Sequence, residues 1–252
     1  MLRICKLRKY RDYFVWISMK YSAASVRAKA LTTSPDVSAA KKMAKSGKVV
    51  SRKTVPPGEV RIIGGLYKRS KLPVTDRPGL RPTPDRVRET LFNWLGQDLS
   101  GWRCVDAFAG TGVLGFEAAS RGALEVLICE QDPVLVDKLK TLQTKLKAVM
   151  VRVERGDGVG LLRRMTPGSL QLVFLDPPYE ANLFEAALKA AAQAIGVPGF
   201  VYLEAPKPWA DDTLLALGLK LHRFGKAGAV HFHLLVKADA PADSQLNLTI
   251  TA

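Results

Sequence analysis

The chain has 252 residues, 47% of them hydrophobic, which allows one domain with a substantial core plus appended segments. No apolar run approaches the roughly 18 residues of a membrane span, so an integral membrane protein is excluded. The net charge is +15, but residues 1–55 hold 14 Lys/Arg against 2 Asp/Glu, so the remainder carries only +3. The high charge therefore does not by itself predict that the folded part binds nucleic acid.

The three cysteines are odd in number and lie far apart, without the spacing of a disulfide framework or a zinc site. Cys104 and Cys129 fall within apolar strand patterns, whereas Cys5 lies in a basic segment. We expect the first two to be reduced core thiols of a cytoplasmic protein and Cys5 to be exposed.

Residues 1–57 are basic and lack sustained periodicity, so we expect a disordered leader. Three interpretations stay open: an arm that attracts RNA, an Arg-rich transit peptide, or an incorrect start with the true one at Met19 or Met43. A secretory signal is excluded because the apolar stretch 14–17 is too short and Lys20 follows it.

Residues 58–80 are predicted to form a β-hairpin and loop that face RNA. Strand-like residues 60–63 and 66–68 flank Gly64-Gly65, a pair typical of a two-residue hairpin turn. Basic side chains that could follow an RNA backbone gather here and just beyond, although a solvated surface explains any single one. They are Arg61, Lys68, Arg69, Lys71, Arg77, Arg81, Arg86 and Arg88.

A helix is predicted to open at residues 82–85, with Thr83 as N-cap and Pro84 in its first turn. Apolar residues at helical spacing then form one face, which we expect to pack on the main sheet: Val87, Leu91, Trp94 and Leu95. The beginning of this helix, with Thr83 and Arg86, would lie near the rim of a ligand site.

The segment 103–130 reads as a strand, a glycine-rich turn, a helix and a second strand ending in Glu130. Gly110, Gly112 and Gly115 match GxGxxG, so an NAD-linked oxidoreductase fits the spacing. Asp106, at the end of the first strand, would repel a pyrophosphate but accept from an ammonium. That carboxylate favours S-adenosylmethionine, a positively charged cofactor with an amino-acid tail.

Strands and helices alternate through residues 126–205, which predicts a parallel sheet. The expected strands are 126–129, 150–154, 170–175 and 200–204, and the expected helices are 133–147 and 182–195. Asp157 is placed to accept from an adenine amino group, although a loop aspartate before a helix is nearly as good an interpretation.

The stretch Asp176-Pro177-Pro178-Tyr179 follows the strand 170–175, and its prolines stop that strand. At the carboxyl end of a parallel strand, a carboxylate beside an aromatic ring suits a planar base with an exocyclic amine. The alternative is an ordinary strand-ending turn with a surface carboxylate.

Near the C-terminus we expect a helix at 210–217 and a closing hairpin of strands 220–224 and 229–236, with 226–228 as its turn and one strand antiparallel. No carboxylate or cysteine accompanies the three histidines, so no metal site is expected; they are His222, His231 and His233. Residues 239–252 lack a core pattern and are predicted to be disordered.

Several of these motifs together resemble the bacterial RsmD family over about residues 58–238. The matching stretches are 61–65, 80–83, 85–95, 106–112 and 176–179, and the run 86–95 is the most specific of them. The resemblance implies an α/β class I S-adenosylmethionine-dependent methyltransferase domain with an N-terminal β-hairpin (58–80) and a catalytic core (81–238). Its Rossmann-like sheet would have seven mostly parallel strands in the order 3-2-1-4-5-7-6, the last of them antiparallel. The leader lies outside the family pattern.

The resemblance further implies transfer of a methyl group to the exocyclic N2 of guanine 966 of 16S rRNA, in the 30S subunit or a late precursor, by a monomer. Implied cofactor contacts are Asp106, Phe108, Gly110 and Gly112, with Glu130 at the ribose, Asp157 and Gly158 at the adenine, and Thr83 nearby. Asp176, Pro177, Pro178 and Tyr179 would hold the target guanine. An adenine-N6 methyltransferase of DNA or RNA and a non-catalytic RNA-binding assembly factor remain alternatives.

Overall fold

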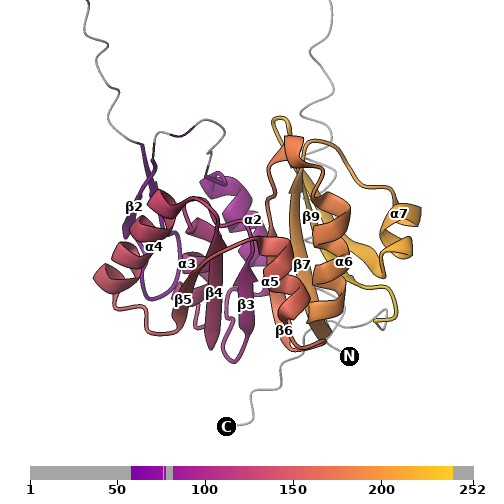
Figure 1. Ribbon diagram of the computed structural model, residues 1–252, viewed down its shortest axis with the longest axis horizontal. Coiled ribbons are helices and arrows are strands. Elements are labelled where there is room, and N and C mark those ends of the chain that lie inside the picture. The colour runs from indigo at the N-terminus through magenta and orange to yellow at the C-terminus, as the bar shows by residue number, and fades with distance from the viewer. Residues whose placement is uncertain (1–57, 76, 78–81, 241–252) are drawn as a thin grey trace, which may run out of the picture. The chain divides into compact units, whose positions relative to one another are not determined.

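The computed structural model describes residues 58–75, 77 and 82–240, which are built around a seven-stranded sheet (Figure 1). Its strand order is β5-β4-β3-β6-β7-β9-β8. The strands are β3 (Arg103–Asp106), β4 (Glu125–Glu130), β5 (Val151–Arg155), β6 (Leu170–Leu175), β7 (Ile195–Ala205), β8 (Leu219–Ala227) and β9 (Val230–Lys237). Strand β9 runs antiparallel to both of its neighbours, and the other pairings are parallel. The predicted order and its antiparallel last strand are confirmed.

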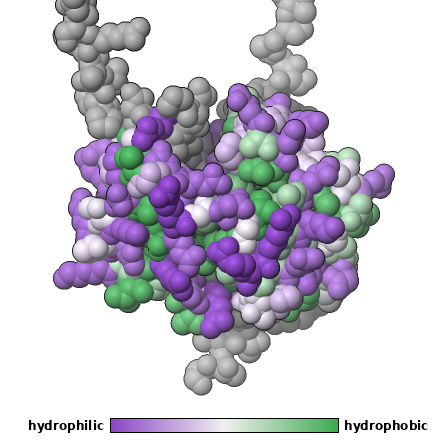
Figure 2. Space-filling model, viewed as in Figure 1, coloured by the Kyte–Doolittle hydropathy of each residue, from purple (hydrophilic) through white to green (hydrophobic). Residues whose placement is uncertain are grey.

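Helices cover both faces of this sheet, as the alternating side chains of its strands require. They are α2 (Asp85–Leu95), α3 (Val113–Ser120), α4 (Pro133–Leu146), α5 (Gly158–Arg164), α6 (Phe184–Ala194) and α7 (Asp211–Ala216). In β6, Leu172 and Phe174 join a core with α2, α3 and α4, whereas Val173 and Leu175 join a core with α5, α6 and α7. On the face of the molecule seen in Figure 2, the surface is largely hydrophilic with scattered hydrophobic residues.

The N-terminal hairpin forms, but with a different second strand from the one predicted. Strand β1 (Glu59–Arg61) pairs with β2 (Lys71–Pro73), and residues 66–68 belong to the loop between them. The Leu66 N–H donates to the Ser120 carbonyl at 2.6 Å, and a Cβ on Gly65, whose φ is +71°, would lie 1.8 Å from that same oxygen. The glycine pair therefore allows a long loop to dock on the end of α3 rather than making a tight hairpin turn.

The start of α2 corrects two further predictions. The N-cap position is Pro84, without a side-chain cap, and the Thr83 hydroxyl instead donates to Glu204 Oε1 at 2.7 Å. The Arg88 side chain is fully buried and forms ion pairs of 2.5 Å with Glu117 and with Asp85. Arg88 is therefore a structural residue in this fold, not an RNA contact.

Other boundaries differ less from those predicted. Strand β7 begins at Ile195 rather than at residue 200, and β8 extends to Ala227, so the last hairpin turns at 228–229. Ala240 is buried in the core that α2, α3 and α4 share, contrary to the disorder expected there. The leader, Arg81 and residues 241–252 lie outside the described residues. Cys104 and Cys129 are buried free thiols, as predicted. Among the residues with described positions, no helix could cross a membrane and no cluster of metal-ligating side chains occurs.

Candidate active site

Three acidic side chains meet at the carboxyl end of three neighbouring strands. Asp106 is the last residue of β3, Asp176 directly follows β6, and Glu204 lies one residue before the end of β7. Asp106 and Glu204 are only 3% and 4% exposed, and Asp176 keeps some exposure. The parallel pairing of β3, β6 and β7 therefore brings together carboxylates that are distant in sequence.

Burial and mutual repulsion change the ionisation of this acidic cluster. Burial, with the charges of Glu130 and Glu204, raises the pKa of Asp106 to about 7 against one stabilising backbone hydrogen bond. Burial is also the main cause that raises the pKa of Asp176 well above its usual range, with Glu204 and Asp106 adding to it. Asp106 and Asp176 therefore tend to keep their protons near neutral pH, and a positively charged group bound beside them would be stabilised.

Glu204 is a residue of this site that the sequence reasoning missed. Its Oε1 accepts from the Thr83 hydroxyl at 2.7 Å and from the Tyr202 hydroxyl at 2.9 Å. Burial raises the pKa of Glu204, whereas these two donors lower it. An available signal was a lone acid in the apolar strand 200–203, at the same strand end as Asp176. Thr83, predicted to contact cofactor, is thus bound to the β7 side of the site.

The glycine loop leads from β3 into α3, as predicted, and contacts the end of β4. The Gly110 N–H donates to Glu130 Oε2 at 2.8 Å, and Asp106 Oδ2 accepts from the Gly115 N–H at 2.9 Å. Gly112 has a φ of +73°, and a Cβ there would lie 2.4 Å from Leu139. The loop is thereby held close to the two carboxylates that the sequence placed around a cofactor.

Asp157 caps helix α5, which is the alternative that the sequence left open. Its Oδ2 accepts from the Gly160 N–H at 2.7 Å and its Oδ1 from the Val159 N–H at 3.3 Å. A Cβ on Gly158 would lie 2.1 Å from the Ala107 carbonyl, so this turn abuts the end of β3. The carboxylate is exposed, and its contact with adenine stays a prediction.

Tyr179 follows the two prolines in a short 3₁₀ turn, Tyr179–Ala181, and its side chain is 43% exposed. Burial, then the charges of Asp176 and Glu204, raises the pKa of Tyr179 to about 12, so its ring is neutral. An uncharged, half-exposed ring next to an acceptor carboxylate can hold a planar base by stacking.

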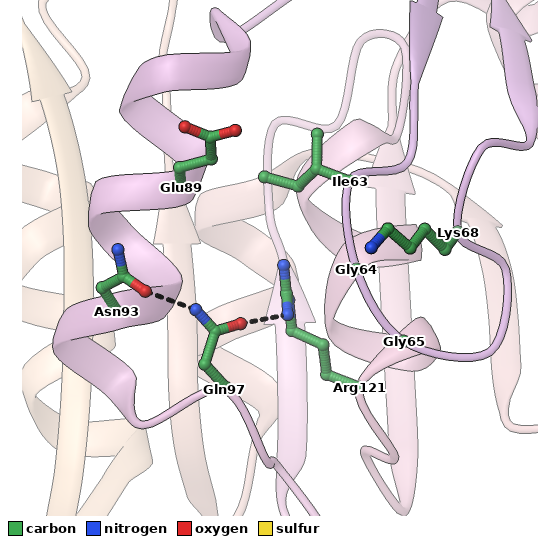
Figure 3. A pocket seen from close by; sticks show the side chains of 8 residues that line it. All are labelled: Ile63, Gly64, Gly65, Lys68, Glu89, Asn93, Gln97 and Arg121. Carbon is green, nitrogen blue, oxygen red and sulfur yellow. Dashed lines mark hydrogen bonds between the residues drawn. The ribbon is translucent and has the colours of Figure 1, made fainter.

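The predicted RNA contacts other than Arg88 are exposed where they are described, and two of them have acidic partners. Lys71 pairs with Glu59 at 2.7 Å, and Arg77 lies 3.3 Å from Asp132. Lys68 lines a pocket of about 520 Å³ between the docked loop and α2 (Figure 3). In that pocket Arg121 donates to the Gln97 side chain, which in turn donates to Asn93, so the pocket is polar, and none of its lining residues belongs to the acidic cluster.

The chain is similar in sequence to one protein family and to named bacterial relatives. The family model described as "Conserved hypothetical protein 95" matches residues 60–236. The Escherichia coli (strain K12) "Ribosomal RNA small subunit methyltransferase D" is 39% identical over 180 residues, 70% of this chain and 89% of the relative. The Haemophilus influenzae protein of the same name is 42% identical over 155 residues, 60% and 80% of the two chains.

Solved structures agree with these relatives. The E. coli protein yhhF superposes with a TM-score of 0.61 at 34% identity, covering 71% of this chain and 98% of that chain. HI0767 of H. influenzae gives a TM-score of 0.59 at 34% identity, covering 71% and 99%. The first is described as a methyltransferase and the second as a methylase.

Proposed function

The chain belongs to the conserved hypothetical protein 95 family, the RsmD family, and from this membership we propose that it methylates the exocyclic N2 of guanine 966 of 16S rRNA, acting as a monomer on the 30S subunit or a late precursor. One observation carries the choice of site. Asp176 and Tyr179 stand together at the carboxyl end of β6, between the glycine loop and Glu204.

S-adenosylmethionine is the cofactor that the residues beside the glycine loop fit. Within the described ranges, neither Asp106 nor Glu130 nor Asp157 forms an ion pair with Lys or Arg, so the wall of this site is acidic. Such a wall suits a sulfonium and an ammonium and disfavours a dinucleotide pyrophosphate. We assign Asp106 to the ammonium, Glu130 to the ribose hydroxyls and Asp157 to the adenine amine; the bound cofactor supplies an electrophilic methyl group.

On the target side, Asp176 and Tyr179 orient the guanine. The lone pair of its exocyclic amine is delocalised into the ring and is a poor nucleophile, so the amine must be positioned and made pyramidal. Asp176 accepts a hydrogen bond from this amine and fixes the direction of its lone pair, while Tyr179 stacks on the base. The amine must also release a proton, which can pass to water after the methyl group has been transferred, so no general base is required.

The test is transfer of labelled methyl groups from S-adenosylmethionine to 30S subunits from a strain without this activity, followed by nucleoside analysis. We expect N2-methylguanosine at one site. N6-methyladenosine would overturn the target base, and absence of label with intact cofactor binding would favour a non-catalytic assembly factor. Asp176→Ala should reduce turnover by about 100-fold or more while cofactor binding persists; wild-type turnover would remove Asp176 from its assigned role.

A further inference from the structure

A row of aromatic rings continues from Tyr179 along the margin of the core that α5, α6 and α7 share. Its ring centroid lies 6.1 Å from that of Phe184 at an interplanar angle of 36°, and Phe184 lies 6.1 Å from Trp209 at 47°. The three residues come from the turn after β6, the first residue of α6 and the loop between β7 and α7. Phe184 and Trp209 pack at the margin of the second core and both remain partly exposed.

The loop that carries Trp209 is anchored to the sheet. The Trp209 backbone N–H donates to His233 Nε2 at 3.3 Å, and His233 Nδ1 lies 3.4 Å from the Leu203 carbonyl oxygen. His233 is fully buried, and burial lowers its pKa to about 4, so the imidazole is neutral and Nε2 can accept. The loop backbone at Trp209 is therefore held in place before any ligand arrives, which reduces the entropy lost on binding.

The charges around these rings favour a base over a phosphate. Lys207 is exposed next to them, but so are Glu185, Asp211 and Asp212. The acidic groups do not attract a phosphate backbone, whereas stacking of a base on an aromatic ring does not depend on charge. The surroundings of Phe184 and Trp209 thus differ from the basic hairpin, whose charge suits an RNA phosphate backbone.

We propose that Phe184 and Trp209 form a stacking platform for the base next to the target guanine in a single-stranded stretch of RNA. The target base occupies Tyr179, and the neighbouring base of the same strand is splayed onto the rings that follow. This inference rests on the proposed function, since it is the position of the target base on Tyr179 that brings the neighbouring nucleotide to Trp209.

The experiment compares methyl transfer to 30S subunits by wild-type protein and by Trp209→Ala, Trp209→Phe and Leu215→Ala. Loss of one stacked base should raise KM about tenfold in Trp209→Ala with kcat nearly unchanged. Trp209→Phe keeps a ring and should stay within about twofold of wild type. Leu215 is 51% exposed on α7, so its truncation is a matched surface control and should change neither constant.

A KM for Trp209→Ala equal to that of wild type would overturn the platform, and so would equal losses in the Ala and Phe variants. If Trp209→Ala unfolds, a second measurement uses an RNA that carries 2-aminopurine beside the target guanine. The quenching of its fluorescence is then compared between wild type, Phe184→Leu and Trp209→Phe. Fluorescence quenching by wild type that Phe184→Leu weakens supports the platform, and unchanged quenching refutes it. Absence of transfer by wild type would instead refute the proposed function, so the two failures are distinguishable.

Discussion

Replacing Arg88 with methionine should destabilise the protein without acting on RNA directly. The guanidinium is fully buried and contacts Glu117 and Asp85, each at 2.5 Å, and the Thr83 carbonyl at 3.1 Å. Removing it leaves the buried Glu117 carboxylate with Arg121, 3.3 Å away, as its remaining cationic partner. Breaking a buried pair on one side costs about 3–5 kcal/mol, and the residual partner places this case near 3. For a domain of this size, that lowers Tm by about 6–12 °C.

Thermal and urea unfolding would measure the effect, with Arg86→Met as the control. Arg86 is exposed on the same helix, so its replacement should change stability by less than about 0.5 kcal/mol. Adding Glu117→Gln to Arg88→Met should recover part of the loss, because the amide is neutral and still accepts from the Ile63 N–H. A free energy of unfolding for Arg88→Met within about 1 kcal/mol of wild type would refute the buried-pair reasoning.

Three further predictions concern the acidic cluster and the docked loop. Asp106 binds a proton in the folded state up to about pH 7 but loses it near its ordinary pKa of 3.8 when unfolded, so the free energy of unfolding should fall as pH rises from about 4 to 7. Between pH 5 and pH 8 the free energy of unfolding should change less in Asp106→Asn than in wild type, and an equal change in both would contradict this. Gly65→Ala should cost more than about 1 kcal/mol, since its Cβ would strike the Ser120 carbonyl, whereas Gly228→Ala, also at positive φ but with open space around it, should cost less in the same urea titration. Thr83→Val removes a hydrogen-bond donor to Glu204 and should lower kcat while cofactor affinity, measured by calorimetry, stays unchanged. An unaltered kcat would show that the hydrogen bond from Thr83 to Glu204 does not contribute to methyl transfer.

Local signals predicted the central elements well because their causes are local. The strand Leu170–Leu175 ends where predicted since two prolines follow it, and α4 begins at Pro133, after an Asp132 side chain that accepts from the Val134 N–H. The order of the strands came from the resemblance and not from periodicity. Propensity alone does not encode which strands become neighbours.

The hairpin was mispredicted because its cause is distant in sequence. Gly64-Gly65 is a strong two-residue turn signal, but both glycines face the end of α3, where Ser120 accepts the Leu66 N–H and donates its hydroxyl to the Gly64 carbonyl. Tertiary docking outweighs the local turn preference, and no window of the hairpin alone contains Ser120.

The error on Arg88 could have been avoided from the pattern itself. Arg88 lies three, four and seven positions before Leu91, Phe92 and Leu95, so it shares their buried side of α2. Glu117 is likewise the only acid of α3, a helix buried along its whole length. Opposite charges on two buried helices are expected to pair, because either alone would be left unpaired in the core.

The acidic cluster shows why the most informative part of the site was only half visible in the sequence. Asp106 and Asp176 stood out because a glycine-rich loop follows the first and two prolines directly follow the second, whereas Glu204 lies within β7, and Pro206 follows it only after Ala205. Yet Glu204 is the acid that Thr83 and Tyr202 hold in place, and its charge adds to burial in raising the pKa of both aspartates. Asp106 and Glu204 are buried and Asp176 is partly exposed, and the three acids have no basic partner among the described residues, which weakens the free fold. In the proposed function, a cationic cofactor on one side relieves that repulsion and the neutral amine on the other side donates a hydrogen bond, so the arrangement that lowers stability would bind the two reactants side by side.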